Sequence, residues 1–341
     1  MKKFIFLTLI LFSVFLLGCG IGSFGSSSSM KDIDIYVGNE GLTAEFAANA
    51  PPQTIFENSN FPIFIRVRNL GAYDIKQDNG IISVGVEKDY IKELKKEAGI
   101  FNQQEPNILT FGLNGKSRIN SNGDELYASL SAKTGQLDPQ SEIHPSTITA
   151  TFCYPYKTIL STTICIDPDF AGIRPGKKVC KIQDMSFSGQ GAPIAVTRIE
   201  PQMVSEGDKV KPQFLIYLEN KGNGNPVRID GYPDACLGKV SANEKVWNAA
   251  YVKAYSSQGQ DQNQLECTPT LKDSGISEDA KTDDKTGFVR FRDRKDYIKC
   301  IFKEGFSRDV DAYTSPLRIE ISYGYVQSIA ANFNIKKPLK Y

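Results

Sequence analysis

The sequence predicts an all-β fold of two tandem β-sandwiches with one short inserted helix. Apolar and polar residues alternate along many short segments, turn-forming Gly, Pro, Asn and Ser lie between those segments, and helical periodicity is rare. Alternation of period two is typical of antiparallel strands with one buried face, and regularly spaced strands favour a sandwich. So little helical pattern argues against α/β folds, which need helical crossovers.

The alternation is clearest in residues 63–67, 126–130 and 317–323, where Ile, Leu, Val or Ala occupies every second position. We therefore expect these segments to be half-buried strands. Further strands are expected over residues 81–86, 109–113, 147–154, 158–166, 214–219, 246–255, 288–292, 298–302 and 332–335.

One helix is expected over residues 89–98, as an insertion between strands. Asp89 is a suitable N-cap, and apolar residues at positions 90, 91, 94 and 98 share one helical face. Gly99 suits the position that follows a helix end.

Two similar segments indicate an internal repeat. Residues 63–71 (IFIRVRNLG) match residues 214–222 (FLIYLENKG), and each is an alternating strand that runs into Asn-x-Gly. Asn and Gly tolerate positive φ, so they allow a tight turn at the end of a strand. We interpret the segments as two copies of one sandwich type, the competing interpretation being a common β-turn. The Gly/Ser/Pro-rich residues 186–193 are the expected linker between domains at 30–185 and 194–341.

The first residues have the pattern of a lipoprotein signal. Met1-Lys2-Lys3 is positively charged, residues 4–17 are mostly apolar, and Leu16-Leu17-Gly18-Cys19 fits the Leu-x-Gly-Cys lipobox. We expect a signal peptide over residues 1–18, lipidation of Cys19, and a Gly/Ser tether up to residue 29. An uncleaved membrane anchor is the less favoured alternative, because the apolar run is shorter than the ~20 residues that span a bilayer. The expected location is the extracytoplasmic face of the cell membrane.

Six cysteines remain after Cys19, and we expect them to form three disulfides. An even count suits an oxidising compartment, whereas the absence of a C-x-x-C pair and the single histidine disfavour a metal site. Closeness in sequence favours two pairs, which leaves the third by elimination, although other pairings stay open. The favoured pairs are Cys165 with Cys180, Cys267 with Cys300, and Cys153 with Cys236.

Tandem strand-Asn-x-Gly units behind a lipid anchor resemble the immunoglobulin-like adhesion-related domains, of the CARDB type, in surface proteins of bacteria and archaea. Several phrases resemble uncharacterised surface lipoproteins of small-genome archaea. They are GLTAEF (41–46), RNLGAYDI (68–75), CYPY (153–156), GQGAP (189–193) and SYGY (322–325). The resemblance covers most of residues 40–335 and implies two immunoglobulin-like sandwiches at the cell surface. Its motifs are structural, so it implies no catalytic residue.

Charge and motifs exclude several function classes. Forty Lys and Arg against 39 Asp and Glu, with no basic block, make nucleic acid an unexpected partner. The sequence shows no phosphate-binding loop, dinucleotide fingerprint or H-E-x-x-H motif. His144 lies in a polar segment, where a surface role is favoured over catalysis. We expect no cofactor and no enzymatic activity, although a glycosidase with two carboxylates distant in sequence stays open.

Two segments are candidates for contact with a ligand or partner. The acidic segment 272–287 holds weak Ca²⁺ candidates, Asp279, Asp283 and Asp284, but their spacing departs from known calcium loops and favours a solvated connection. Tyr154 and Tyr156 flank a proline at an expected hairpin tip, where exposed rings would contact a partner. The alternation of the segment instead favours burial of these rings in the core.

The function that fits these expectations best is a membrane-anchored binding, adhesion or scaffold module with a protein or glycan partner at the cell surface. An accessory subunit of a secretion or envelope complex and a cell-envelope hydrolase are the alternatives. A concave site with convergent polar groups would distinguish them.

Overall fold

The computed structural model of the chain describes residues 34–99, 101–241, 245–258, 261–270, 272 and 284–338. The expected signal, Cys19 and the tether lie outside the described residues, and their roles stay predictions. Residues Asp34–Tyr341 form one compact unit. Within the described part of the chain, no helix is long and apolar enough to cross a membrane.

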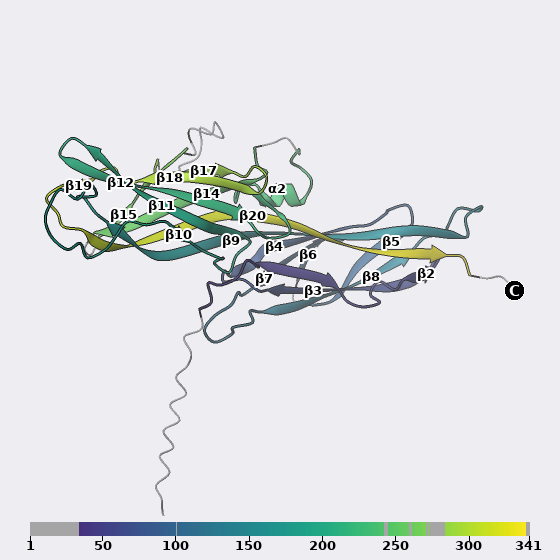
Figure 1. Ribbon diagram of the computed structural model, residues 1–341. Coiled ribbons are helices and arrows are strands. Elements are labelled where there is room, and N and C mark those ends of the chain that lie inside the picture. Colours follow the sequence, from purple (N-terminus) through teal and green to yellow (C-terminus); the bar gives the residue numbers. More distant parts are fainter. Residues whose placement is uncertain are drawn as a thin grey trace, which may run out of the picture. The chain divides into compact units, whose positions relative to one another are not determined.

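The unit consists almost entirely of β-structure, as the sequence predicts (Figure 1). The elements among the described residues are, in chain order, β1 (Leu42–Phe46), β2 (Thr54–Phe56), β3 (Asn60–Asn69), β4 (Ile75–Gly85), β5 (Ile91–Ala98), β6 (Asn102–Glu105), β7 (Ile108–Leu113), β8 (Glu125–Thr134), β9 (Ile143–Ile166), β10 (Met185–Ser186), β11 (Ile194–Glu206), β12 (Lys209–Asn220), β13 (Asn225–Val227), α2 (Tyr232–Cys236), β14 (Ala249–Gln258), β15 (Asp261–Gln264), β16 (Glu266–Thr268), β17 (Gly287–Arg290), β18 (Lys295–Ile301), β19 (Phe306–Ser307) and β20 (Tyr313–Lys336).

Three sheets form a sandwich-like arrangement. Their strand orders are β1-β3-β8-β5, β10-β11-β12-β18-β16 and β15-β14-β20-β9-β4-β7-β6. The four-stranded sheet packs against the late part of β20, as the contact between Phe61 and Phe333 shows. The six-stranded sheet packs against the early part of β20, where Phe306 contacts Tyr313. The alternating apolar residues of the facing strands join into one continuous core.

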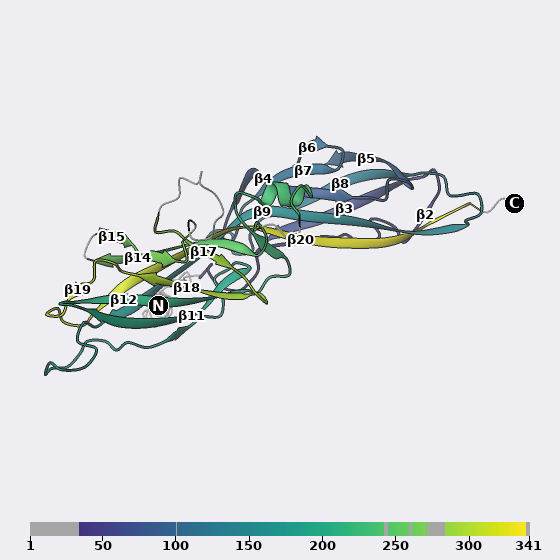
Figure 2. The same cartoon turned by 90° about the horizontal axis from the view of Figure 1, so that it is seen from above.

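Two long strands connect the two sandwich halves. β9 and β20 pair antiparallel over their whole length, from Tyr313 opposite Ile166 to Lys336 opposite Ile143, and they lie side by side in both views (Figures 1 and 2). β20 also pairs with β14 in one half and with β2 in the other. Residues 30–185 and 194–341 are therefore not separate units, contrary to the expected division, because each long strand contributes to both halves.

The expected linker at residues 186–193 is packed into the structure. Gln190 is buried, and its side chain hydrogen-bonds both the amide and the carbonyl of Val196, at 2.8 and 3.1 Å. The carbonyl of Gly191 accepts a 2.8 Å hydrogen bond from the Ala72 amide. The small residues of this segment allow close backbone contact between the halves, which is a different use of glycine from flexibility.

The helix expected over residues 89–98 is wrong, because this segment is strand β5 and pairs with β8. Register shifts between Ile91 and Glu93 and between Lys96 and Ala98 interrupt its alternation and leave apolar residues at helix-like spacing. Backbone pairing with β8 overrides that local pattern. The short helix that the structure describes is α2, which has a proline in its first turn.

The hairpin expected around Pro155 is also wrong, because this residue lies within β9. Pro155 is opposite Gly324 of β20, whereas the ladder between β9 and β4 ends at Cys153. Pro155 therefore has a paired strand on one side only, where a proline is tolerated.

Three disulfides join the cysteines in the pairs that the sequence separations favoured. Cys153–Cys236 connects β9 with α2, Cys165–Cys180 closes the segment after β9, and Cys267–Cys300 links β16 with β18.

Candidate functional site

The first Asn-x-Gly turn is organised around a buried asparagine. Asn69 ends β3, and its Nδ2 donates to the carbonyls of Tyr73 at 2.8 Å and Leu113 at 3.1 Å. Its Oδ1 accepts a 3.0 Å hydrogen bond from the hydroxyl of Tyr156. The asparagine therefore satisfies carbonyls from two segments and a buried tyrosine together.

The second turn repeats this arrangement at the end of β12. The Nδ2 of Asn220 donates to the Gly224 carbonyl at 2.8 Å, and its Oδ1 accepts a 3.0 Å hydrogen bond from the hydroxyl of Tyr325. The internal repeat is thus present in the hydrogen bonds as well as in the sequence.

The glycines of the two turns have a different role from the one expected. Neither Gly71 nor Gly222 has positive φ. A Cβ on Gly71 would overlap the Tyr156 hydroxyl, and a Cβ on Gly222 would overlap the Tyr325 hydroxyl. Close approach of a tyrosine, rather than backbone conformation, requires glycine here.

Four tyrosines meet where β9 and β20 cross between the halves. Tyr154, Tyr156, Tyr323 and Tyr325 are at most 1% exposed, and their neighbouring ring centroids are 5.6 to 6.3 Å apart. Burial raises the pKa of each hydroxyl, that of Tyr325 to about 12. Tyr154 and Tyr156 are therefore core residues, and the prediction that their rings are exposed to a partner at a loop tip is wrong.

Tyr154 and Tyr323 occupy equivalent positions in the motifs CYPY and SYGY, one on each long strand. The Tyr323 oxygen accepts a 3.3 Å hydrogen bond from the Ile194 amide and is 3.1 Å from Thr158 Oγ1. Thr158 also donates to the Ile194 carbonyl at 2.7 Å. Every polar group around Tyr323 is thus engaged.

The environment of Tyr154 is incomplete by comparison. Gln327 takes the position of the threonine and donates from Nε2 to the Leu42 carbonyl at 2.8 Å. Burial raises the pKa of Tyr154 well above its ordinary value, and the Leu42 amide offsets this only in part. The Tyr154 hydroxyl has no hydrogen-bond partner among the described residues.

A cavity of about 340 Å³ lies beside Tyr154. Its walls are residues 39–44, Pro193, the turn at 221–223, and residues 325 and 327–329 of β20. The sequence gave no warning of this cavity, because its walls come from three distant segments. The phrases GLTAEF and SYGY, which lie in or next to two of its walls, are the signal that was available.

His144 does not form a serine–histidine pair with its neighbour on β9. Its Nε2 is 3.0 Å from Glu87 Oε2, and its ring stacks on Tyr90 at 3.8 Å. Ser146 donates to the same Glu87 oxygen at 2.9 Å rather than to the histidine. The hydrogen bond from His144 lowers the pKa of Glu87. A nucleophilic serine needs a hydrogen bond to the imidazole, which this arrangement does not provide for Ser146.

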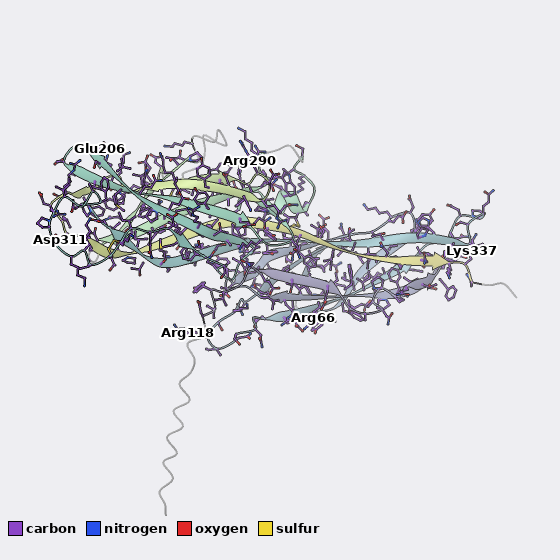
Figure 3. All side chains as sticks on the ribbon, viewed as in Figure 1. Arg66, Arg118, Glu206, Arg290, Asp311 and Lys337 are labelled. Atoms are coloured by element: carbon purple, nitrogen blue, oxygen red, sulfur yellow. A yellow bond between two sulfur atoms is a disulfide. The ribbon has the colours of Figure 1, made fainter. Side chains whose placement is uncertain are left out.

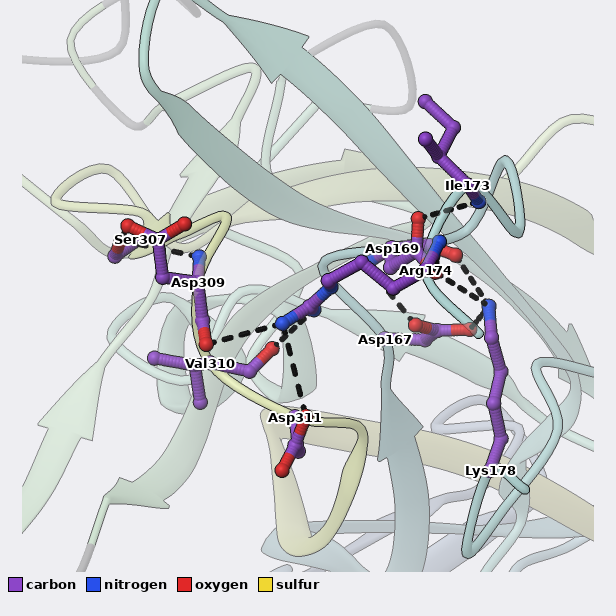
Figure 4. Close-up of polar contacts among 9 residues, drawn as sticks. All are labelled: Asp167, Asp169, Ile173, Arg174, Lys178, Ser307, Asp309, Val310 and Asp311. Atoms are coloured by element: carbon purple, nitrogen blue, oxygen red, sulfur yellow. Dashed lines mark hydrogen bonds and ion pairs between the residues drawn. The ribbon is translucent and has the colours of Figure 1, made fainter. Parts of the chain in front are cut away.

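A charged cluster follows β9 (Figure 4). Lys178 Nζ is 2.6 Å from Asp167 Oδ2, and the backbone amides of Ile173 and Arg174 bond to Asp169, which lowers the pKa of this carboxyl. The Arg174 guanidinium donates to the carbonyls of residues 309 and 310, at 3.0 and 2.7 Å. These charges are satisfied within the cluster, which orders the segment closed by Cys165–Cys180.

The Ca²⁺ prediction remains open. Asp279 and Asp283 lie outside the described residues, whereas Asp284 is exposed and pairs with Lys272. In the described ranges, no group of three or more His, Cys, Asp or Glu side chains is placed to hold a metal ion.

Charges on the outer face of the four-stranded sheet pair across strands. Arg66, labelled in Figure 3, lies 3.2 Å from Glu45 and 2.6 Å from Glu125, and Arg68 lies 3.1 Å from Glu125. This face therefore carries alternating charge rather than a basic patch.

Comparisons with known proteins show no family for this chain. No protein-family model matches it, and no curated protein matches it. Weak similarity in structure links it to three proteins. They are the secreted serine protease VesC from Vibrio cholerae (8% identity, 83% of this chain, 50% of that chain, TM-score 0.20), the partial N-terminal region of an enterococcal surface protein (9%, 90%, 96%, 0.17) and the B domain of a biofilm associated protein (6%, 86%, 73%, 0.18). The chain spans about half the length of the protease. All three TM-scores are too low to support an argument about function, so the resemblance to CARDB-type lipoproteins stays a prediction.

Proposed function

We propose that the protein is a lipid-anchored binding module on the extracytoplasmic face of the cell membrane. The observation that carries this proposal is the pairing of all six cysteines after Cys19 in three disulfides. Structural disulfides form and persist in oxidising compartments and are rare in the cytosol. The lipobox at Cys19 supplies the anchor, and diacylglycerol with its two chains holds a protein on a membrane more firmly than one chain does.

The rigid β-scaffold supports the binding part of the proposal. The β9–β20 ladder passes through both halves, and Cys153–Cys236 fixes α2 to it. Binding residues held by such a scaffold lose little conformational freedom when a ligand binds. The partner is a protein or glycan at the cell surface.

The anchor and the location are tested with the full chain and Cys19→Ser in cells grown with labelled palmitate. The wild type is expected in the membrane fraction, labelled with palmitate and accessible to an impermeant amine reagent on intact cells. Cys19→Ser is expected to be unlabelled and either unprocessed or released. Equal membrane retention of an identically cleaved, unlabelled form would contradict the proposal.

A further inference from the structure

The cavity beside Tyr154 contains two buried polar atoms that lack partners. The Tyr154 hydroxyl and Asn39 Oδ1 both belong to residues that line it, and neither has a hydrogen-bond partner within the described part of the chain. Buried polar groups in folded proteins are almost always hydrogen-bonded. The equivalent hydroxyl of Tyr323 follows this rule through Thr158 and Ile194. The fold can therefore satisfy such a tyrosine, and it does so at one of the two positions only.

The missing partners define the chemistry of a ligand. The Tyr154 hydroxyl has a proton to donate, whereas Asn39 Oδ1 can only accept. An alcohol group does both, since it carries one donor and two acceptor sites. An anion would leave the Asn39 oxygen without a donor. The two atoms together therefore favour a neutral ligand rich in hydroxyl groups.

The remaining walls agree with such a ligand. Most polar lining side chains are neutral, and the charged ones, Glu40 and Lys221, have opposite signs. Backbone groups contribute as well. Gly41 bonds to Leu70 of the neighbouring segment, so by the alternation of antiparallel strands the amide and carbonyl of Ala44 face away from β3. Ala44 lines the cavity.

An added peptide strand does not fit this edge of β1. Gln327 bonds to the Leu42 carbonyl and so occupies the edge position next to Ala44. Strand addition needs a run of consecutive edge groups, which this contact interrupts. The cavity volume of about 340 Å³ is at the lower end of the range for small-molecule sites. That size suits one ring of a carbohydrate.

We propose that this cavity, formed by β1, the turn at 221–223 and β20, binds one sugar unit of a surface glycan through Tyr154 and Asn39. This proposal rests on the proposed surface function and names the class of its ligand.

The test uses the detergent-solubilised full chain on a glycan array, followed by saturation-transfer NMR with the methyl glycoside of the best-bound terminal sugar. Tyr154→Phe is expected to weaken binding about tenfold, the effect of one lost hydrogen bond, while Tm is unchanged or raised. The matched control is Tyr323→Phe, which removes an engaged hydroxyl outside the cavity. It is expected to lower Tm and to change sugar affinity less than twofold.

A second variant keeps the test decisive if Tyr154→Phe misfolds. Asn223→Trp fills the cavity from an exposed turn and is expected to abolish sugar binding without unfolding the chain. The proposal is overturned if no glycan on the array binds, if both tyrosine variants bind equally well, or if Asn223→Trp retains full affinity. The palmitate and surface-labelling experiment does not involve this cavity, so failure of the ligand assignment and failure of the proposed function are distinguishable.

Discussion

The hydroxyl of Tyr156 lies 3.0 Å from Oδ1 of Asn69, and this one contact joins the two sheets of the first sandwich half. Tyr156 belongs to β9, which also extends into the second half, whereas Asn69 ends a strand of the facing sheet. Tyr325 and Asn220 form the equivalent contact from β20. The two turns thus anchor their sheets to the two strands that the halves share.

Asn69→Ala is expected to lower the free energy of unfolding by about 2 to 4 kcal/mol, because it removes the donors to two carbonyls and the acceptor of a buried hydroxyl. Tyr156→Phe removes one hydrogen bond and is expected to cost about 1 kcal/mol. Urea unfolding of the two variants checks this order. Equal losses would mean that Asn69 acts only through the tyrosine.

Gly71→Ala is expected to destabilise the protein by about 1 to 3 kcal/mol. Its Cβ would lie 2.6 Å from the Gly191 carbonyl and 2.7 Å from the Glu40 carbonyl, so main-chain atoms must move. Gly85→Ala is the matched control, because its nearest contact is the Thr149 side chain, which rotates at little cost. Thermal unfolding should show a clear loss for the first variant and a small one for the second. A comparable loss for both would exclude close backbone packing at residue 71 as the cause.

The strands that sequence analysis identified are those with uninterrupted alternation, such as β3, β8 and β12. β11 was missed because a register shift between Val196 and Arg198, followed by Pro201, breaks its pattern. β5 was assigned to a helix for a related reason. The continuity of β9 through Pro155 was not predictable locally, because it depends on the pairing of this residue with Gly324.

The candidate site was predictable only in part. The disulfide pairs follow from sequence separation, and the burial of Tyr154 and Tyr156 follows from alternation in their segment. The cavity beside Tyr154 depends on where the turn at 221–223 lies relative to β1 and β20, which no local pattern encodes. The missing hydroxyl partner became visible only when Tyr154 was compared with Tyr323 in three dimensions.

The disulfides are expected to contribute unequally to stability. Cys153–Cys236 closes a loop of 83 residues and Cys165–Cys180 one of 15. The chain-entropy model gives about 4 to 5 kcal/mol for the longer loop and about 3 kcal/mol for the shorter one. Paired Cys→Ala variants of each bridge, compared by denaturant unfolding, should show the larger loss for Cys153→Ala/Cys236→Ala. A larger loss for the short loop would show that native packing, rather than loop length, dominates.

The four buried tyrosines predict that the protein loses stability above pH 10. Burial raises the pKa of their hydroxyls in the folded protein, whereas in the unfolded chain they ionise near 10. Below pH 10 both states keep these protons, so stability does not change. Above it the unfolded chain binds fewer protons, so each such tyrosine lowers the free energy of unfolding by about 1.4 kcal/mol per pH unit until its folded pKa is reached.

Phenolate absorbance and circular dichroism, recorded together as pH rises, test this prediction. Exposed tyrosines such as Tyr297 are expected to ionise first with the fold intact. The buried hydroxyls are expected to ionise only with the loss of β-structure, in one cooperative and hysteresis-free step at low protein concentration. Because Tyr323→Phe removes one buried group that ionises on unfolding, this variant should show a shallower fall in stability with pH above pH 10, whatever its stability at neutral pH. Ionisation of all 15 tyrosines near pH 10 with the β-structure retained would contradict the burial of the cluster in solution.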